Sequence, residues 1–360
     1  MLYRPTWAEI NLDFLIKNYE YAKQKAYPKT IIPVIKADAY GHGAVKIMEA
    51  LYQKGVTFFA VSLLEEAVEL RTVNKRIGIL ILGPILPHQF DICHKHKLSI
   101  TVYDEEIAKA LLAFDKPLTF HIKIDTGMHR YGLTSWTEVH KLIDKFQTSV
   151  HVMEGIYTHF ATANEQNELY YHQIAQFEEL LNSLAQKPPM IHVSNSSSTL
   201  KYEDHIPWTT HARLGISLYG LSLDEDKTHL HPVMSLKSQV VQIKTLQKGD
   251  TVGYGATYKA FLDTERIAVI PIGYADGFIR RNKTGHVQIG SKLYPIVGII
   301  CMDACFIKVD QDVSVGDEVI IFGDLISIDD VARRLSTINY EVVCQLSKRV
   351  PRVYVRGGNV

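Results

Sequence analysis

The chain has 360 residues, of which 46% are hydrophobic and 22% are charged, so its composition is that of a globular protein with room for two domains. Lys and Arg together number 39, as do Asp and Glu, and this balance leaves no overall positive charge to attract nucleic acid or a membrane surface. We therefore expect neither as a partner, and any anion that the protein binds must be captured by a local site.

The first residues and the cysteines indicate the cellular compartment. The opening sequence "MLYRPTWAEI" contains no apolar segment of signal-peptide length, and the apolar stretch Ile77–Leu86 is too short to cross a bilayer. The four cysteines are scattered, at Cys93, Cys301, Cys305 and Cys344. Only Cys301 and Cys305 lie close together, and no second Cys or His pair accompanies them at zinc-site spacing. We expect a cytoplasmic protein with reduced thiols and no bound metal.

Short apolar, β-branched segments alternate with segments of helical periodicity through the first two thirds of the chain. The eight expected strands, in chain order, are Ile31–Ile35, Val56–Ser62, Ile77–Gly83, Leu98–Tyr103, Leu118–Ile124, Val150–His159, Met190–Ser194 and Arg213–Ile216. The helices expected between them include Leu63–Val73, Glu105–Phe114, Thr137–Phe146 and Leu169–Ala185. Apolar strands separated by helices are typical of a parallel sheet, and eight such units predict a (β/α)8 barrel of the TIM type. The alternative is a doubly wound open sheet, but the GxGxxG sequence that usually follows its first strand is absent.

The character of the sequence changes after Gly220. A polar connection, "LSLDEDKTHLHP" at 221–232, precedes β-rich segments with Gly-Asp turns at 249–250 and 316–317. One amphipathic helix is expected at Ile328–Leu335, and the N-terminal "TWAEINLD" also has the pattern of a strand. We therefore expect three parts, which are an N-terminal strand at 1–10 that pairs with the C-terminal domain, a barrel at 11–225 and a mainly β C-terminal domain at 226–360.

Reactive side chains follow several of the expected strands. Since the functional site of a parallel barrel lies where strands end and loops begin, we expect these side chains on one rim. In chain order they are Lys36, then Lys123, Asp125 and Arg130, then His159, then Asn195, Ser196 and Ser197, and finally Arg213, Gly215 and Ile216.

The last two of these loops have the composition of a phosphate site. The sequences "SNSSS" and "LGIS" offer hydroxyl groups and small residues that allow the backbone to approach an anion. Lys36, in "IIPVIKADAYGHG" at 31–43, would lie across the same opening. A lysine there suggests pyridoxal phosphate held as a Schiff base, which requires an amine that is neutral part of the time. Taken singly, each signal is weak, because a lysine after a strand is usually a solvated surface residue and a serine-rich segment is usually a loop.

Nine segments resemble, in the same order, those of the alanine racemases, and the resemblance as a whole extends from residue 7 to residue 352. They are "VIKADAYGHG", "KIDTGMHRYG", "YTHFATAN", "HVSNSSS", "ARLGISLYG", "GYGATYKA", "IPIGYADG", "GIICMDACF" and "INYEVVCQLSKRVPR". The lysine turn is shared with other pyridoxal-phosphate barrels, whereas "GYGATY", "GYADG" and "CMD" are much more specific to the racemases.

The resemblance implies a pyridoxal-phosphate-dependent homodimer that interconverts L-alanine and D-alanine and supplies D-alanine for peptidoglycan synthesis. It implies that each active site joins the barrel of one subunit to the β domain of the other. Lys36 would hold the cofactor and act as the base on one face of the substrate, and Tyr254 from the second subunit would act on the opposite face. Racemisation requires both bases, since a proton leaves one side of Cα and returns to the other.

The same resemblance implies further contacts with the cofactor. The positions that contact its phosphate correspond to Tyr40, Ser196, Gly215, Ile216 and Tyr340. Arg213 would face the pyridine nitrogen and leave it unprotonated, because an arginine does not readily give up a proton. His159 would link Arg213 to the tyrosine base.

Other residues would act on the substrate. Arg130 would orient the phenolic oxygen of the cofactor and the substrate carboxylate, which would also meet the backbone N–H of Met302. Lys123 corresponds to a lysine that many members carry as a carbamate, and Tyr274 corresponds to a residue that lines the substrate entrance. In "CMDAC" an alanine follows Asp303 where an amide is common in the family, which leaves the hydrogen bonding of Asp303 open.

Three other functions remain as alternatives. A non-enzymatic pyridoxal-phosphate carrier with a similar barrel would lack a β domain with a second base, and a related decarboxylase would lack the racemase segments of the C-terminal domain. A serine racemase would perform the same chemistry on another side chain. Tyr340 and Tyr274 would narrow the pocket and favour a small substrate, but a pocket discriminates only modestly against one extra hydroxyl, so side activity on serine is compatible with the sequence.

Overall fold

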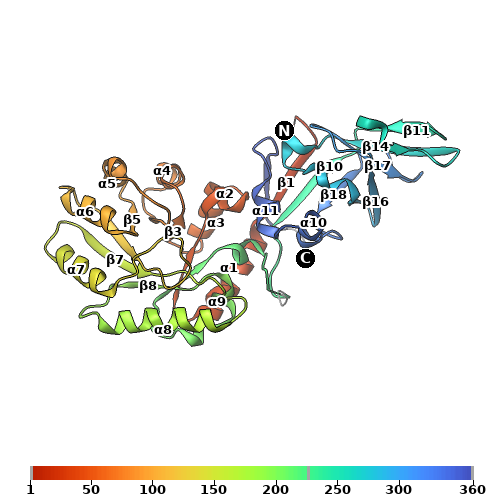
Figure 1. Cartoon of the computed structure of the whole chain (residues 1–360). Coiled ribbons are helices and arrows are strands. Elements are labelled where there is room, and N and C mark those ends of the chain that lie inside the picture. Colours follow the sequence, from red (N-terminus) through yellow and green to blue (C-terminus); the bar gives the residue numbers. More distant parts are fainter. Residues whose placement is uncertain (1–2, 225–227, 358–360) are drawn as a thin grey trace. The chain divides into compact units, whose positions relative to one another are not determined.

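The computed structural model describes residues 3–224 and 228–357, and its contacts divide the chain into two units (Figure 1). The barrel unit extends from Ile16 to Leu230, and the C-terminal unit combines the residues up to Leu15 with those from His231 onward. The units therefore separate at Leu230, whereas the boundary expected at 225–226 lies outside the described residues.

Within its described residues, the barrel unit contains eight parallel strands, which is the fold expected from the sequence. They are β2 (Thr30–Pro33), β3 (Phe58–Val61), β4 (Gly78–Ile81), β5 (Ser99–Val102), β6 (Thr119–Lys123), β7 (Val152–Tyr157), β8 (Met190–His192) and β9 (His211–Leu214). Strands β3 to β8 pair in chain order, and β2 pairs with β9. A bridge between Val34 and Ala60 joins β2 to β3, and the N–H of Thr210 donates to the carbonyl of Ile191 at 2.9 Å, which joins β9 to β8 and closes the ring.

Helices connect these strands and lie outside them (Figure 1). They are α1 (Leu12–Ala26), α3 (Ala44–Tyr52), α4 (Leu64–Val73), α5 (Phe90–Lys95), α6 (Glu105–Ala113), α7 (Trp136–Gln147), α8 (Glu168–Ser183) and α9 (Ser196–Lys201). Asp104, Ser135 and Asn167 explain where three of them begin, because their side chains accept hydrogen bonds from N–H groups in the first turns of α6, α7 and α8. In α7 the buried residues Val139 and Phe146 lie seven positions apart and share one face of the helix.

The C-terminal unit is built on a nine-stranded sheet with the order β11-β14-β17-β16-β15-β18-β10-β1-β19. The strands are β1 (Thr6–Asn11), β10 (Met234–Gln239), β11 (Gln242–Gln247), β14 (Thr264–Ile270), β15 (His286–Ile289), β16 (Lys292–Val297), β17 (Cys305–Val309), β18 (Glu318–Phe322) and β19 (Arg352–Val355). A separate pair is formed by β12 (Thr251–Val252) and β13 (Tyr258–Lys259). The helix expected from the sequence is α10 (Ile328–Leu335), and α11 (Asn339–Cys344) follows it.

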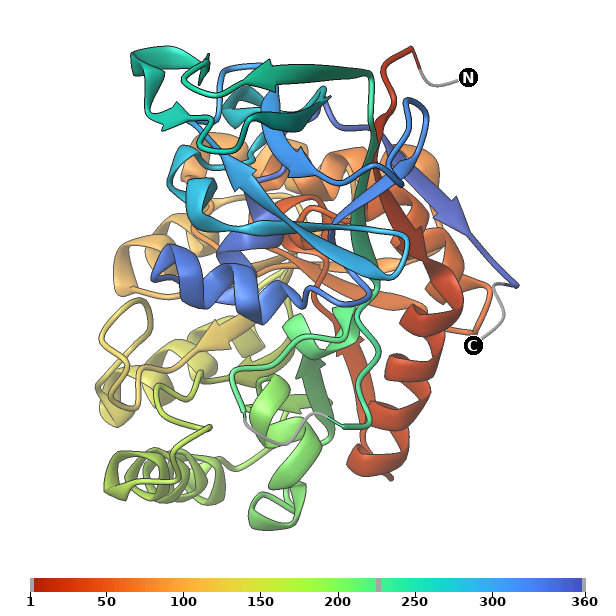
Figure 2. The ribbon, with the colours of Figure 1, turned by 90° about the vertical axis from the view of Figure 1, so that its right-hand side faces the viewer.

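The N-terminal strand β1 lies inside this sheet, beside the green strand β10 and the blue strand β19 (Figure 2). It pairs antiparallel with β10 and parallel with β19. Its alternate side chains Thr6, Ala8 and Ile10 are fully buried, which matches the alternation of the sequence "TWAEIN". Because a shift of one residue would expose all three, this alternation specifies the register of the strand.

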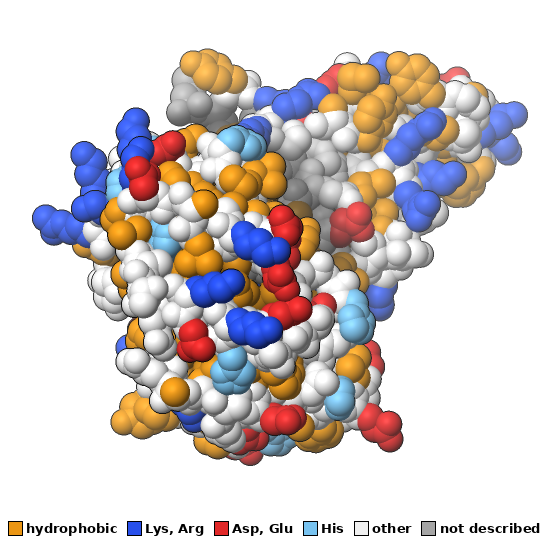
Figure 3. Space-filling model, turned by 60° about the vertical axis from the view of Figure 1, so that its left-hand side comes forward, with side chains coloured by type: hydrophobic (Ala, Val, Ile, Leu, Met, Phe, Trp, Pro, Cys, Tyr) orange, Lys and Arg blue, Asp and Glu red, His pale blue; other side chains and the backbone are white. Residues whose placement is uncertain are grey.

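The charged side chains of both signs are interspersed over the face of the molecule in Figure 3. This distribution agrees with the equal totals of acidic and basic residues in the sequence. Within residues 3–224 and 228–357, none of the helices combines the length and the apolar character needed to cross a membrane.

Candidate active site

Lys36 stands at the start of a left-handed turn. It follows β2 and is half-buried, and the next four residues, Ala37, Asp38, Ala39 and Tyr40, have φ values of 51°, 52°, 55° and 53°. This conformation costs L-residues roughly 1–2 kcal/mol each, so the turn α2 (Lys36–Tyr40) persists only because its surroundings stabilise it. Backbone strain of this kind is concentrated at functional sites.

Glu66, in the first turn of α4, supplies part of that stabilisation. Its carboxylate accepts hydrogen bonds from the backbone N–H groups of Ala37 at 2.5 Å, Ser62 at 2.8 Å and Leu63 at 3.0 Å. One side chain thus fixes both the turn after β2 and the turn after β3. No local pattern predicts this role, since Ala37 lies 29 positions before Glu66.

Tyr40, Ser196 and Gly215 converge on one point of the barrel rim. The Oγ of Ser196 accepts hydrogen bonds from the backbone N–H groups of Gly215 at 3.0 Å and Ser217 at 3.3 Å, which flank Ile216. A Cβ on Gly215 would lie 2.9 Å from the Tyr40 hydroxyl and 3.6 Å from Ser196 Oγ, so a side chain would fill this space. Among the described residues, the buried hydroxyl of Ser217 has no hydrogen-bond partner. The three hydroxyls of Tyr40, Ser196 and Ser217 surround a gap that only glycine leaves, and together they form a cradle that fits a phosphate.

Arg213, at the end of β9, is held by a dense set of hydrogen bonds. Its Nη1 donates to the carbonyl of His192 at 2.6 Å and to His192 Nδ1 at 2.7 Å. Its Nη2 donates to the carbonyls of Thr158 at 2.8 Å and Val193 at 3.1 Å, and lies 3.3 Å from His159 Nδ1. Within the described residues Nε makes no hydrogen bond, so it is the N–H group of Arg213 that remains for a ligand.

Positive charge accumulates at this rim. Burial lowers the pKa of Lys123 to about 8, and the charges of Arg130, Arg213 and Lys36 act in the same direction. Burial and the same cations hold the pKa of His159 well below its ordinary value, so this imidazole is neutral at physiological pH. A site with four cations and a neutral histidine is suited to a ligand that carries more than one negative charge.

The loop from Asp125 to Leu133 presents Arg130, whose side chain is exposed. The Oδ1 of Asp125 accepts hydrogen bonds from the three backbone N–H groups of residues 127–129 at 2.9–3.0 Å, which fixes the loop. A shallow surface depression lies beside it, lined by Lys123, Ile124, Asp125, Met128, Arg130, Tyr131, Thr158 and His159. The barrel unit thus brings together Lys36, Tyr40, Lys123, Arg130, His159, Ser196, Arg213, Gly215 and Ile216 at the carboxyl ends of its strands.

The other predicted site residues, Tyr254, Tyr274, Met302 and Tyr340, belong to the C-terminal unit. Tyr254 begins the 3-10 turn Tyr254–Ala256 directly after Gly253, whose φ of 72° favours glycine. Its side chain is 71% exposed, so the hydroxyl is accessible to another molecule. Tyr340 is half-buried at the start of α11.

Tyr274 and Met302 lie on two turns that are bonded to each other. The N–H of Tyr274 donates to the carbonyl of Cys301 at 3.0 Å, and the N–H of Ala275 donates to the carbonyl of Met302 at 3.1 Å. A Cβ on Gly273 would lie 2.3 Å from each of these two carbonyl oxygens. The glycine of "GYADG" therefore permits the close approach of the two turns.

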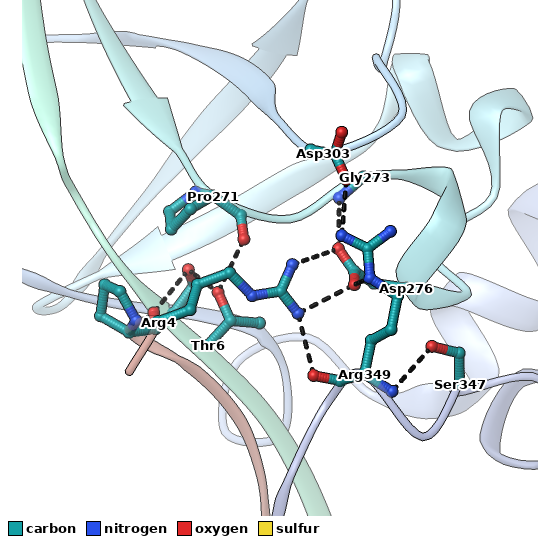
Figure 4. A network of polar contacts seen from close by, with 10 residues as sticks. Arg4, Thr6, Pro271, Gly273, Asp276, Asp303, Ser347 and Arg349 are labelled. Atoms are coloured by element: carbon teal, nitrogen blue, oxygen red, sulfur yellow. Dashed lines mark hydrogen bonds and ion pairs between the residues drawn. The ribbon is translucent and has the colours of Figure 1, made fainter. Parts of the chain in front are cut away.

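Asp276 anchors this pair of turns (Figure 4). Its carboxylate accepts two hydrogen bonds from Arg4, both at 2.8 Å, and a third from the N–H of Gly273 at 3.0 Å. Arg349 lies 3.5 Å from the same carboxylate and donates to Asp303 at 2.6 Å. Asp303, whose hydrogen bonding could not be predicted from the sequence, thus forms an ion pair with Arg349. The neighbouring sequence does not predict the roles of Arg4 and Arg349, because each side chain pairs with a carboxylate far away along the chain.

Comparison with known proteins agrees with this architecture. The model of the alanine racemase N-terminal domain matches residues 10–223, and that of the alanine racemase C-terminal domain matches residues 233–354. An alanine racemase of Geobacillus kaustophilus is 40% identical over 375 residues, which cover 99% of this chain and 96% of the relative. The structure of an alanine racemase of Clostridium difficile 630 superimposes with a TM-score of 0.94 at 37% identity, covering 99% of this chain and 97% of that one. A histidine racemase of Leuconostoc mesenteroides superimposes with a TM-score of 0.91 at 27% identity, covering 99% of both chains. The chain therefore belongs to the alanine racemase family.

Proposed function

We propose that the protein is a pyridoxal-phosphate-dependent alanine racemase, which interconverts L-alanine and D-alanine by a two-base mechanism. The similarity to alanine racemases over nearly the full chain supports this proposal. The structural observation that carries it is the cradle of Tyr40, Ser196 and Gly215 on the same rim as Lys36. We further propose that the enzyme is cytoplasmic and that its product supplies peptidoglycan synthesis.

The barrel rim supplies the groups that pyridoxal phosphate requires. The residues proposed to contact its phosphate are Tyr40, Ser196, Gly215, Ile216 and Tyr340. Lys36 is the primary amine with which its aldehyde would combine. When bound, the cofactor withdraws electrons from an attached amino acid and so acidifies the proton on Cα.

Arg213 is proposed to face the ring nitrogen of the cofactor. The support is that its Nη groups are occupied by protein acceptors, whereas Nε has no acceptor among the described residues. Although burial lowers the pKa of Arg213 to about 10, the guanidinium stays protonated at neutral pH. It therefore offers the ring a hydrogen bond but no proton, which moderates electron withdrawal and disfavours side reactions such as transamination.

Lys36 and Tyr254 are proposed as the two bases, one on each face of Cα. A tyrosine has an ordinary pKa of about 10, so it needs help to lose its proton at neutral pH. His159 can provide that help, because Arg213 donates to its Nδ1 and the proton of the neutral ring is therefore on Nε2, where it can stabilise a phenolate. Tyr254 is exposed on the C-terminal unit, and we propose that it acts in the site of a second subunit of a homodimer.

The substrate carboxylate is proposed to bind Arg130 and the backbone N–H of Met302, with Tyr274 at the entrance. Lys123 would hold Arg130 in place as a carbamate. Its pKa of about 8 leaves part of the amine neutral at physiological pH. The nitrogen of the neutral amine attacks the carbon of CO2, one C–O π bond opens, and one proton is released to solvent.

The fold alone does not specify which amino acid is racemised, since a histidine racemase shares it. Alanine is favoured because the chain is more similar in sequence to alanine racemases than to that enzyme. The large side chains of Tyr274 and Tyr340 also favour a small substrate. Because a pocket rejects one extra hydroxyl only modestly, we expect weaker activity on serine.

The proposal is tested by borohydride reduction of the cofactor-loaded protein, followed by peptide mapping and by assays of D-alanine formation from L-alanine. We expect the reduced adduct on Lys36, and racemisation that is faster with alanine than with serine or histidine. Protein saturated with cofactor but without an adduct at Lys36 would refute the assignment of the site. An adduct at Lys36 with faster turnover of histidine or serine would refute the assignment of the substrate.

A further inference from the structure

A line of polar side chains runs from Arg213 through the interior of the barrel. Arg213 Nη1 lies 2.7 Å from His192 Nδ1, His192 Nε2 lies 2.9 Å from His121 Nδ1, and His121 Nε2 lies 3.0 Å from Glu154 Oε2. We refer to Arg213, His192, His121 and Glu154 as the barrel relay. Both histidines are fully buried, whereas 28% of the Glu154 side chain is exposed, so the barrel relay joins the proposed cofactor site to solvent.

The two ends of the barrel relay fix the position of every proton in it. A guanidinium only donates hydrogen bonds, and a carboxylate only accepts them. His192 must therefore accept at Nδ1 and carry its proton on Nε2, and His121 must do the same. Burial lowers the pKa of both histidines, and the charge of Arg213 lowers them further, so both rings are neutral. Any other tautomer would place two N–H groups or two lone pairs face to face.

A β-bulge in β7 aims Glu154 at this line. Where β6 pairs with β7, Phe120 lies opposite Met153, and the next residue, His121, lies opposite Gly155. Glu154 is therefore an extra residue on its strand, and its carboxylate reaches His121 instead of following the regular alternation. Bulges commonly re-aim a side chain in this way.

Gly155 provides the space for the same contact. A Cβ at this position would lie 2.3 Å from Nδ1 of His121 and 2.8 Å from the carbonyl oxygen of Met190, which is closer than real contacts allow. Its φ is outside the left-handed region, so the backbone itself does not require glycine. The bulge and the glycine are thus two separate features of β7 that bring Glu154 and His121 together.

We propose that Glu154 is a positioning residue for Arg213 and acts through the tautomers of His121 and His192. The proposal rests on the proposed function, in which Arg213 serves the cofactor ring. The carboxylate keeps the proton of His121 on Nε2, which leaves Nδ1 of His192 able to accept from Arg213. Without the carboxylate, the histidines can adopt the reversed tautomers, and an N–H of His192 would then meet an N–H of Arg213 and displace the guanidinium.

Glu154 is equipped to be ionised at neutral pH. Burial raises the pKa of its carboxyl group, but hydrogen bonds from His121 and Ser99 outweigh burial and leave this pKa below its ordinary value. The hydroxyl of Ser99 donates to the same Oε2 at 2.7 Å without touching either histidine of the barrel relay. Ser99 therefore offers a matched control, since its loss weakens the site of Glu154 but leaves an acceptor for His121.

The first test uses wild-type protein with 15N-labelled histidine, loaded with pyridoxal phosphate. Long-range 1H–15N correlation spectra distinguish the two neutral tautomers and the cation, and spectra of His121→Gln and His192→Gln assign the two rings. We expect both rings as neutral tautomers protonated at Nε2. A proton on Nδ1 of either ring would overturn the proposal whether or not the protein racemises alanine, so the result is independent of the proposed function.

The second test compares Glu154→Leu with Ser99→Ala. We expect Glu154→Leu to shift the imidazole signals of His192 and to lower kcat roughly tenfold, with KM changed less than about twofold. Ser99→Ala should leave the His192 signals and kcat within about twofold of wild type. Unchanged His192 signals and kcat in a folded Glu154→Leu protein would overturn the proposal, and if this variant does not fold, the wild-type spectrum decides.

Discussion

The replacement of Arg4 by methionine tests how the turns that carry Tyr274 and Met302 are held. Methionine keeps much of the length of the side chain but cannot pair with the carboxylate of Asp276. The side chain of Asp276 is fully buried, whereas that of Arg4 is 27% exposed. The variant therefore leaves a buried carboxylate without its bidentate partner, while Arg349 stays at 3.5 Å.

The expected loss of stability follows from this geometry. Removal of one partner of a buried ion pair usually destabilises a protein by roughly 3–5 kcal/mol. Because Arg4 is partly exposed and Arg349 still faces Asp276, we expect the lower end of that range, about 3 kcal/mol. For a unit of this size each kcal/mol corresponds to roughly 2–4 °C, so the melting temperature of the C-terminal unit should fall by about 6–12 °C.

Differential scanning calorimetry of the full-length protein measures this change, with Arg333→Met as the matched control. Arg333 pairs with Asp330, but the two side chains are 75% and 40% exposed, so this loss should be below about 0.5 kcal/mol. Equal melting temperatures for the two variants would refute the view that Arg4 compensates the buried charge of Asp276.

Four further predictions concern the proposed site. Gly215→Ala places a Cβ 2.9 Å from the Tyr40 hydroxyl and should weaken binding of pyridoxal phosphate about tenfold in a fluorescence titration; unchanged affinity would contradict the phosphate cradle. Tyr254→Phe should slow deuterium exchange at Cα of one alanine enantiomer far more than the other, as followed by NMR, and equal slowing would exclude the two-base assignment. Mixing the inactive variants Lys36→Ala and Tyr254→Phe should restore part of the activity through hybrid dimers, whereas no recovery after confirmed subunit exchange would argue against a shared site. Because only the neutral amine of Lys123 reacts with CO2 and its pKa is about 8, the 13C NMR signal of a carbamate should grow as the pH rises from about 7 to about 9; a signal that falls over this range would contradict the assignment.

The strands of the barrel were predictable because each is a short apolar segment between helical ones. The expected strand Leu98–Tyr103, for example, contains β5 (Ser99–Val102), and the expected helix Ile328–Leu335 has the bounds of α10. Polar residues just after such strands could be placed on one rim from the parallel topology alone. Lys36 and Arg213, which lie at the ends of the first and last of these strands, are therefore predictable as neighbours on one rim.

The features that the sequence did not reveal depend on distant partners. The left-handed turn after Lys36 consists of residues that do not favour this conformation by themselves, and the carboxylate that helps to hold it comes from Glu66 on another element. Likewise, nothing in the apolar pattern of β7 marks Glu154 as a bulge, since a bulge is defined by the pairing with β6. Local patterns specify elements, whereas these contacts arise only when the elements are packed together.

The position of β1 between β10 and β19 has a consequence for synthesis on the ribosome. Roughly 220 residues separate the end of β1 from the start of β10, and at 5–20 residues per second their synthesis takes on the order of 10–45 s. All strands of the barrel are made within that interval, so the barrel can close while β1 still lacks both neighbours. During this interval the nascent chain therefore carries β1 without its partner strands. Its side chains Ala8 and Ile10, which are buried in the folded sheet, are not yet covered. The sheet around β1 can therefore form only after β10 and β19 have been synthesised, which exposes an unpaired strand edge during translation.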